Sequence, residues 1–242
     1  MLSSLPLITL RRDDEKTFCD TPLRRKWQIV SGEFHFRPWK HLRSKDKKDM
    51  FHNIALSLEN IGIQVKSPYK LIPVQVLMHM HKYSIEHIVP RSKINGSSSG
   101  AAENDPRGWW IADRDMNSLR RNLPLALWPD RFDDDDDKHN THFIRSVNGV
   151  DHFFPPNTKR PMLARIWLFV RYNFRCVDVF DPPSVAQTQH SDHICENAKL
   201  NVGQQEIEMN IKFKEKYGIS NPLIEDASWL DEYEFIQACF HH

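Results

Sequence analysis

The spacing of hydrophobic residues along the chain predicts helices in five places, and the one that begins at Asp113 or Asp115 is described below with its polar residues. From Met50 to Ile61, apolar residues recur at helical intervals, which is typical of an amphipathic helix with Gly62 as its cap. From Pro161 to Val170 the chain is apolar on most helical faces, so this helix is expected in the core. The other two predicted helices cover residues 204–217, with Ile207, Ile211 and Phe213 facing inward, and residues 226–240.

Shorter apolar runs predict β-strands. Lys26–Val30 and Glu33–Phe36 are runs of this kind near the N-terminus, and Trp109–Ile111 has the length of a strand. Lys70–Met80 also predicts extended chain, although Pro73 argues against a central position in a sheet. Residues 92–108, 129–158 and 181–200 are polar or rich in turn-forming residues and predict loops. Helices with a modest share of strand indicate an α+β fold.

The bulk composition sets few limits on function. The 242 residues suit one large domain, and 33 basic against 32 acidic residues give a net charge of +1. Any surface for nucleic acid must therefore be local. Four cysteines far apart in the sequence do not indicate a disulfide framework. No signal peptide or membrane-spanning stretch is recognisable, so we expect a protein that is intracellular or carried within a particle.

The segment Tyr83–Ser92 carries the most informative chemistry. Glu86 directly precedes His87 at the end of an apolar, strand-like run. A histidine can take a proton from an attacking water, and a carboxylate oxygen suits Mg²⁺. Because successive side chains of a strand point to opposite faces, the two residues reach one site only if the strand bends or bulges there.

A second group of polar residues follows in a predicted helix. Asp113 or Asp115 is expected to cap its start, and Pro124 is expected to end it. The amide oxygen of Asn117 is a candidate second ligand for a divalent cation. Arg120 lies three residues later on the same helical face, where its guanidinium could bind the scissile phosphate. Candidates for contacts to flanking phosphates are Arg91, Arg107 and Arg114.

These two segments together resemble a known nuclease family. Ile85-Glu-His-Ile-Val-Pro90 and Asp115-Met-Asn-Ser-Leu-Arg-Arg-Asn-Leu-Pro124 are similar to the paired motifs of the bacterial endonuclease I family, nonspecific nucleases of the ββα-metal, or His-Me finger, class. The family pattern is roughly Glu-His-Val-x-Pro, followed later by Val-Asn-x-x-Arg-Gly-Asn. Arg121 stands here where the family usually has glycine.

The resemblance implies a function and a role for each matching residue. It implies a metal-dependent endonuclease that hydrolyses DNA or RNA, DNA being favoured, with little sequence specificity. Glu86 and Asn117 match the ligands of one Mg²⁺, which Mn²⁺ or Ca²⁺ could replace, and His87 matches the general base. Arg120 matches the phosphate-binding arginine, while Arg121 and Asn122 fall in the nucleic-acid-binding segment. It also implies that residues 46–242 form the nuclease domain, with additional helices around its ββα-metal core, after an N-terminal arm and strands in residues 1–45.

Other interpretations remain open at this stage. The protein could instead be a structural or binding component of a large assembly, built on a nuclease-like fold, with segments 129–158 and 181–200 packed on protein partners. A sequence-selective enzyme of the same superfamily is a further alternative. Cys176, His190, His193 and Cys195 could form a zinc site, although a solvated loop is the favoured interpretation there.

Overall fold

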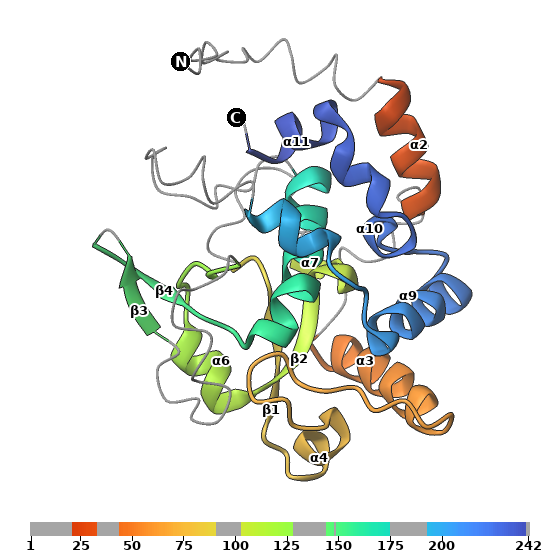
Figure 1. The fold of residues 1–242 in the computed structure, drawn as a ribbon. Helices are drawn as coiled ribbons and strands as arrows, with labels where there is room; N and C mark the ends of the chain where they lie inside the picture. Colours follow the sequence, from red (N-terminus) through yellow and green to blue (C-terminus); the bar gives the residue numbers. More distant parts are fainter. Residues whose placement is uncertain are drawn as a thin grey trace.

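The computed structural model of the protein describes residues 21–32, 44–90, 103–127, 144–147, 149–174 and 193–240. Within these residues the chain forms helices and two small antiparallel sheets, which confirms the α+β class (Figure 1). The helices are α2 (Pro22–Ser31), α3 (Ser44–Glu59), α4 (Val74–His79), α6 (Arg114–Arg120), α7 (Arg160–Asn173), α9 (Gln204–Tyr217), α10 (Pro222–Glu225) and α11 (Tyr233–Phe240). Shorter 3-10 turns are η4 (Pro106–Gly108), η5 (Asn157–Lys159) and η6 (Ala227–Asp231), and the strands are β1 (Tyr83–His87), β2 (Trp109–Asp113), β3 (Ile144–Val147) and β4 (Val150–Phe153).

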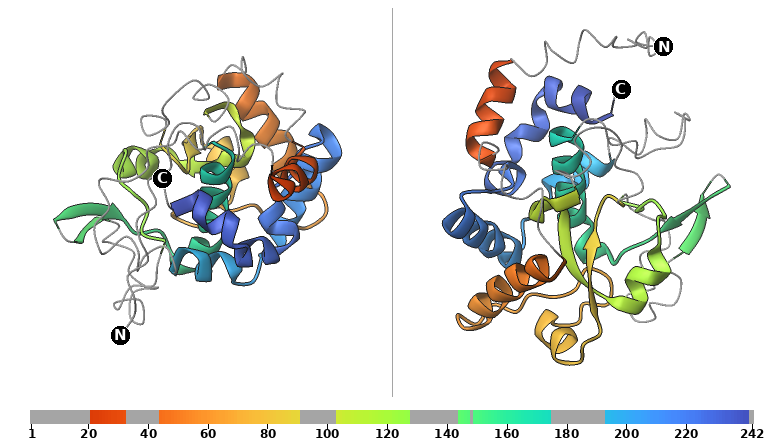
Figure 2. Two further views of the ribbon diagram at one scale, coloured as in Figure 1. Left: turned by 90° about the horizontal axis from the view of Figure 1, so that it is seen from above. Right: turned by 180° about the vertical axis from the view of Figure 1, so that it is seen from behind.

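Helix α7 occupies the centre of the molecule, as its apolar sequence predicted. All but two of its residues are buried, and Figures 1 and 2 show it surrounded by the other elements. Trp27 of α2 packs on it, with ring centroids 4.6 Å from Tyr172 and 6.0 Å from Phe169. Because Trp27 is fully buried in the same core, residues 22–31 are packed on the domain that was expected to begin at residue 46.

Helix α3 connects the β1–β2 sheet to α9. Phe51 lies 5.5 Å from Trp110 of β2 and 6.1 Å from Phe213 of α9, measured between ring centroids. The predicted helix around Met50 is confirmed, because α3 buries Met50, Ile54 and Leu58. The sheet is thereby fixed at one end of the common hydrophobic core.

Two predicted strands are helices instead. Lys26–Val30 lies within α2, where Thr21 accepts a hydrogen bond from the Arg24 amide and Pro22 begins the helix. Gly32 ends α2 in the left-handed conformation, with φ +67°. Most of Lys70–Met80 is likewise irregular chain and α4, which starts directly after Pro73. The predicted strand Glu33–Phe36 lies outside the described residues.

Further differences concern loops and helix faces. The predicted loop 129–158 contains the β3–β4 hairpin, and residues 193–199 of the second irregular segment are helical. The predicted terminal helix is divided into η6 and α11. Helix α9 has its predicted bounds, but Ile211 is 40% exposed, and Met209 is buried instead.

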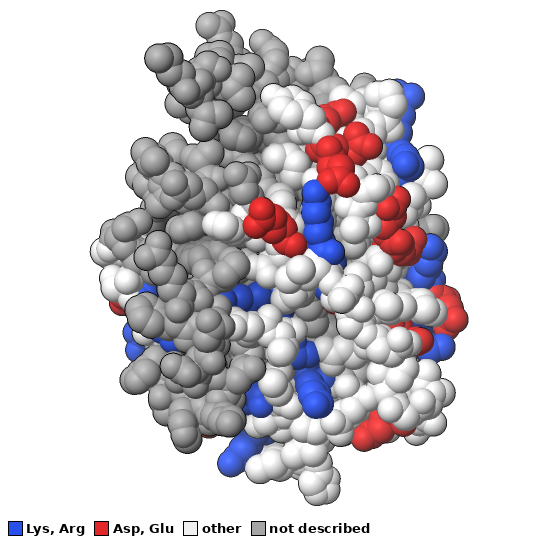
Figure 3. Space-filling model, in the orientation of Figure 1, with Lys and Arg blue, Asp and Glu red and all other residues white. Residues whose placement is uncertain are grey.

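Surface charge is unevenly distributed on the face drawn in Figure 3. Acidic side chains gather mainly in its upper part, where α10 and α11 lie, whereas several basic side chains lie lower. Within the described ranges, no helix has the length and apolar character needed to cross a membrane.

Candidate functional site

The candidate site is built on β1, β2 and α6. The two strands are antiparallel, with Glu86 opposite Trp110 and His87 opposite Trp109. Helix α6 follows β2 without a loop, because the Asp113 carboxylate caps it by accepting the Met116 amide at 3.0 Å. The chain therefore runs strand, strand, helix, and the two sequence motifs lie against each other (Figure 1).

Asn117 reaches from α6 to the backbone of β1. Its Nδ2 donates to the Ser84 hydroxyl at 2.9 Å and to the Ile85 carbonyl at 3.1 Å. Since a carbonyl can only accept, this contact fixes which end of the amide faces the strand. Among the described residues nothing donates a hydrogen bond to Oδ1 of Asn117, so this oxygen remains available as a ligand.

Glu86, which follows the Ile85 that Asn117 contacts, is buried and is held through one oxygen only. Its Oε1 accepts hydrogen bonds from the Tyr69 hydroxyl and from Nη1 of Arg120, each at 2.6 Å. No donor to Oε2 occurs within the described part of the chain. One oxygen of the carboxylate is therefore fixed in place, and the other is open.

Arg120 differs from its predicted role. Its side chain is 2% exposed, and the guanidinium donates to Glu86, to the His87 carbonyl at 3.0 Å and to the Ile88 carbonyl at 2.8 Å. Nε of Arg120 is buried and finds no acceptor among the described residues. An arginine engaged in this way orients the carboxylate and the end of β1, so the expected direct contact with a phosphate does not fit its placement.

Two other buried ion pairs show a different arrangement. Arg165 donates to both oxygens of Glu206, at 2.7 and 2.6 Å, and Arg107 donates to both oxygens of Asp105, at 2.9 Å each. These are bidentate pairs, in which the planar guanidinium satisfies the whole carboxylate. The Glu86–Arg120 pair alone among these three leaves an oxygen and a donor without partners.

Burial dominates the electrostatics of this cluster. It raises the pKa of Glu86 above the usual value, while the charge of Arg120 and the hydrogen bond from Tyr69 act to lower it. Burial and the neighbouring Glu86 raise the pKa of Tyr69 well above its usual value, so the phenol stays protonated and acts as a donor. A divalent cation near Glu86 would offset part of this desolvation.

His87 faces away from Glu86 and Asn117. Its ring lies 6.0 Å from that of Trp109, and its Nε2 donates to the Glu103 carbonyl at 3.1 Å. Strand pairing is regular through His87, and the Ile88 amide continues it with a bond to the Gly108 carbonyl. The bend that would bring both side chains to one site is absent, so the structure brings together Glu86, Asn117 and Arg120 but not His87.

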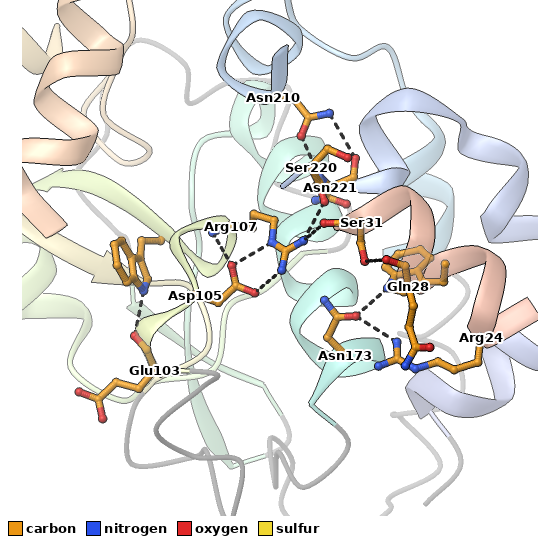
Figure 4. A network of polar contacts seen from close by, with 12 residues as sticks. Arg24, Gln28, Ser31, Glu103, Asp105, Arg107, Asn173, Asn210, Ser220 and Asn221 are labelled. Carbon is orange, nitrogen blue, oxygen red and sulfur yellow. Dashed lines mark hydrogen bonds and ion pairs between the residues drawn. The ribbon is translucent and has the colours of Figure 1, made fainter. Parts of the chain in front are cut away.

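The remaining predicted site residues are scattered. Arg107 is buried, and it donates to the Ser31 and Ser220 carbonyls in addition to Asp105 (Figure 4), a placement that does not fit the predicted contact with nucleic acid. Arg114 is exposed and donates to the His81 carbonyl at 2.8 Å. Arg121 and Asn122 are exposed, and Arg91 lies outside the described residues.

No pattern in the sequence indicated that Tyr69 belongs to the candidate site. It lies in an irregular segment before α4, and only the fold brings its hydroxyl to Glu86. Nor do the described residues contain a cluster of three or more His, Cys, Asp or Glu side chains able to bind a metal. Of the candidate zinc ligands, Cys176 and His190 lie outside the described residues, and His193 contacts Glu196.

Comparison with known proteins adds no relative. Neither the models of protein families nor the curated proteins compared with this chain gave a significant match.

Proposed function

We propose that the protein is a divalent-cation-dependent endonuclease that hydrolyses phosphodiester bonds of DNA, or RNA, with little sequence specificity. The observation that carries this proposal is the pair of open oxygens, Oε2 of Glu86 and Oδ1 of Asn117, on adjoining β1 and α6. Both are hard oxygen ligands of the kind that Mg²⁺, Mn²⁺ and Ca²⁺ prefer. Two protein ligands would leave positions for water and a phosphate oxygen.

The local fold supports the same proposal. The order β1, β2, α6 is the order that a ββα-metal core requires, with one ligand from the first strand and one from the helix. Arg121 has φ +51° and ψ −126°, a backbone conformation that favours glycine. The endonuclease I family, which the two motifs resemble, usually has glycine at this position.

Each residue of the cluster would have a separate task. A bound Mg²⁺ would stabilise negative charge that develops on the phosphate. Glu86 and Asn117 would hold the ion, while Tyr69 and Arg120 would keep Glu86 correctly oriented through Oε1. A neutral His87 would accept the proton of the attacking water at the ring nitrogen that carries no proton.

The proposal requires a local rearrangement at the end of β1. Glu86 and His87 point to opposite sides of the strand, and a base must lie within hydrogen-bonding reach of the water that it activates. This movement would require that the contact from His87 to the Glu103 carbonyl be broken. We therefore expect the chemical shifts of the His87 ring to change when Mg²⁺ and a short DNA duplex are added.

A structural or binding role in an assembly is the second candidate. The observation that favours it is the burial of Glu86, which is 1% exposed and bonded to both Tyr69 and Arg120. A cluster closed in this way stabilises the junction between β1 and α6 without any catalysis. Under this alternative, the protein would bind neither Mn²⁺ nor Mg²⁺ at Glu86.

Plasmid cleavage with and without a chelator tests the proposal. The parent protein should degrade plasmid DNA in Mg²⁺, the chelator should abolish cleavage, and His87→Ala should reduce the rate at least about a hundredfold. His79→Ala is the matched control, because His79 is an exposed histidine of α4. Cleavage by His87→Ala at the parental rate would exclude His87 as the base, and Mn²⁺ binding unchanged by Asn117→Ala would exclude the metal site.

A further inference from the structure

Basic side chains gather at the end of the β1–β2 sheet from which α6 begins. Tyr83 of β1 and Asp113 of β2 are opposite each other at this end. The ammonium of Lys48, in α3, lies 5.2 Å from the centre of the Tyr83 ring, and that of Lys70 lies 3.7 Å from Oδ1 of Asp113. Two lysines from separate segments therefore converge on one pair of strand residues.

Arg114 and Lys82 complete this group of cations. The backbone amide of Arg114 donates to the Lys82 carbonyl at 3.1 Å, and its guanidinium donates to the His81 carbonyl at 2.8 Å. Arg114 and Lys82 are both exposed. Four segments of the chain thus supply one surface, which we call the basic patch and which consists of Lys48, Lys70, Lys82 and Arg114.

Positive charge predominates on the exposed surface of the basic patch. Asp113, the carboxylate at its centre, is only 5% exposed, because it also accepts the Met116 amide as the cap of α6. The exposed carboxylates that adjoin the patch in the sequence are Asp49 and Asp115. Basic side chains likewise gather in the lower part of Figure 3, where Figure 1 draws β1, α4 and α6. A polyanion at this surface would therefore be attracted.

The basic patch adjoins the candidate metal site on two sides. Arg114 precedes Asn117 by three residues, so both lie on one face of α6, and Asn117 donates to the Ser84 hydroxyl of β1. Tyr69, whose hydroxyl holds the candidate carboxylate ligand, is followed directly by Lys70. A nucleic acid strand with one phosphate at the metal would place neighbouring phosphates over the patch.

We propose that the basic patch binds the phosphodiester backbone of duplex DNA beside the bond that is cleaved. The choice of ligand rests on the proposed function, because a nuclease with little sequence specificity must hold the backbone and not the bases. Lysine ammoniums on flexible stems and an arginine guanidinium are the side chains that suit phosphate oxygens. The patch thereby determines on which side of the metal the DNA extends.

Fluorescence anisotropy of a labelled DNA duplex tests the patch in the full chain, with a chelator present so that no strand is cut. Lys48→Met and Lys70→Met should each weaken binding about three- to tenfold and should lower the slope of log K against log salt by about 1. Lys70→Arg retains the charge and should bind like the parent protein. Lys199→Met is the matched control for Lys70→Met, because Lys199 also pairs with one aspartate and its side chain is 42% exposed, against 41% for Lys70.

Comparing DNA binding with plasmid cleavage separates this inference from the proposed function. Binding with the expected dependence on Lys48 and Lys70, but without cleavage, would support the patch and contradict the nuclease. Cleavage together with equal binding by Lys70→Met and Lys199→Met would overturn the patch alone. The patch is also overturned if the parent protein does not bind the duplex, or if it binds only vesicles that contain phosphatidylserine.

Discussion

Two kinds of buried ion pair occur in this molecule, and they differ in completeness. Asp105 and Arg107 use every carboxylate oxygen and join three segments, because the same guanidinium also reaches the Ser31 and Ser220 carbonyls (Figure 4). Glu86 and Arg120 are equally buried, yet Oε2 of the glutamate and Nε of the arginine have no partners among the described residues. A pair that only stabilises the fold is best when complete, so the incomplete pair is the candidate for binding a ligand.

Complete and incomplete ion pairs should also contribute differently to the stability of the fold. Breaking a complete buried pair strands a charge in the interior, and stability falls steeply. An incomplete pair retains acceptors and donors for a third group, which reduces its contribution to the fold. Conservative substitutions at Asp105 and Glu86 should therefore have different consequences.

The largest expected effect is the loss of stability in Asp105→Asn. Both oxygens of Asp105 accept from Arg107, so the amide nitrogen of asparagine must face a donor, and the cost should be about 3–5 kcal/mol. In Glu86→Gln, the amide oxygen can replace Oε1 opposite Tyr69 and Arg120 while Nε2 takes the open position, and the cost should be about 1–3 kcal/mol. Denaturant unfolding of both variants measures the difference.

The two variants should rank in the opposite order when metal binding, rather than stability, is measured. Glu86→Gln should abolish Mn²⁺ binding, because it removes the ligand charge, whereas Asp105→Asn should bind Mn²⁺ normally at temperatures where it is folded. Equal destabilisation of the two variants would show that the open oxygen has no energetic significance. Normal Mn²⁺ affinity in Glu86→Gln would remove Glu86 from the site.

A smaller effect should follow from the loss of the Tyr69 hydroxyl. Tyr69→Phe deletes one of the two donors to Oε1 and should cost about 1 kcal/mol of stability. The hydrogen bond from Tyr69 lowers the pKa of Glu86, so its removal should raise that pKa further. Protons compete with the metal for the carboxylate. As pH is lowered, the variant should therefore lose its affinity for the metal at a higher pH than the parent protein does.

The sign of this pH effect follows from burial. Because burial raises the pKa of Glu86, the protonated carboxyl is favoured in the fold, and its contribution to stability decreases as pH rises from the usual glutamate value to the folded one. With metal bound, the ionised carboxylate should be favoured instead, so the contribution of Glu86 to stability should increase as pH rises. Mn²⁺ titrations from about pH 4 to 8 give the midpoint, with Tyr83→Phe on β1 as the control. An unchanged midpoint in Tyr69→Phe would contradict the positioning role.

The sequence predicted a helix correctly where the apolar periodicity extended over several turns or where a capping residue was present. Residues 204–217 span about four helical turns and were predicted with the correct ends. Of the two caps predicted for α6, Asp113 and Asp115, the structure has Asp113. The strand predicted for residues 26–30 was wrong, because a short apolar run fits a strand or a buried helix equally well. The capping residues Thr21 and Gly32 on either side of α2 were the signal that could have decided between them.

The candidate site was predictable only in part. Local motifs identified Glu86 and Asn117, and the fold brings them to neighbouring positions on β1 and α6. The contributions of Tyr69 and Arg120 depend on contacts between distant segments and on burial, neither of which leaves a local pattern. The alternation of side chains between the two faces of a strand, in contrast, correctly predicted that Glu86 and His87 point to opposite sides unless β1 bends.

The smallest expected effect concerns the end of α6, which carries both Asn117 and Arg120. Arg121 ends this helix at φ +51°, and such a conformation costs a non-glycine residue about 1–3 kcal/mol. Glycine removes this strain but loses about 0.5–1 kcal/mol of backbone entropy, so Arg121→Gly should raise the free energy of unfolding by on the order of 1 kcal/mol. Arg121→Ala removes the same charge without relieving the strain, and it should leave stability nearly unchanged. Equal stabilities of the two variants in denaturant unfolding would show that the backbone at residue 121 is unstrained.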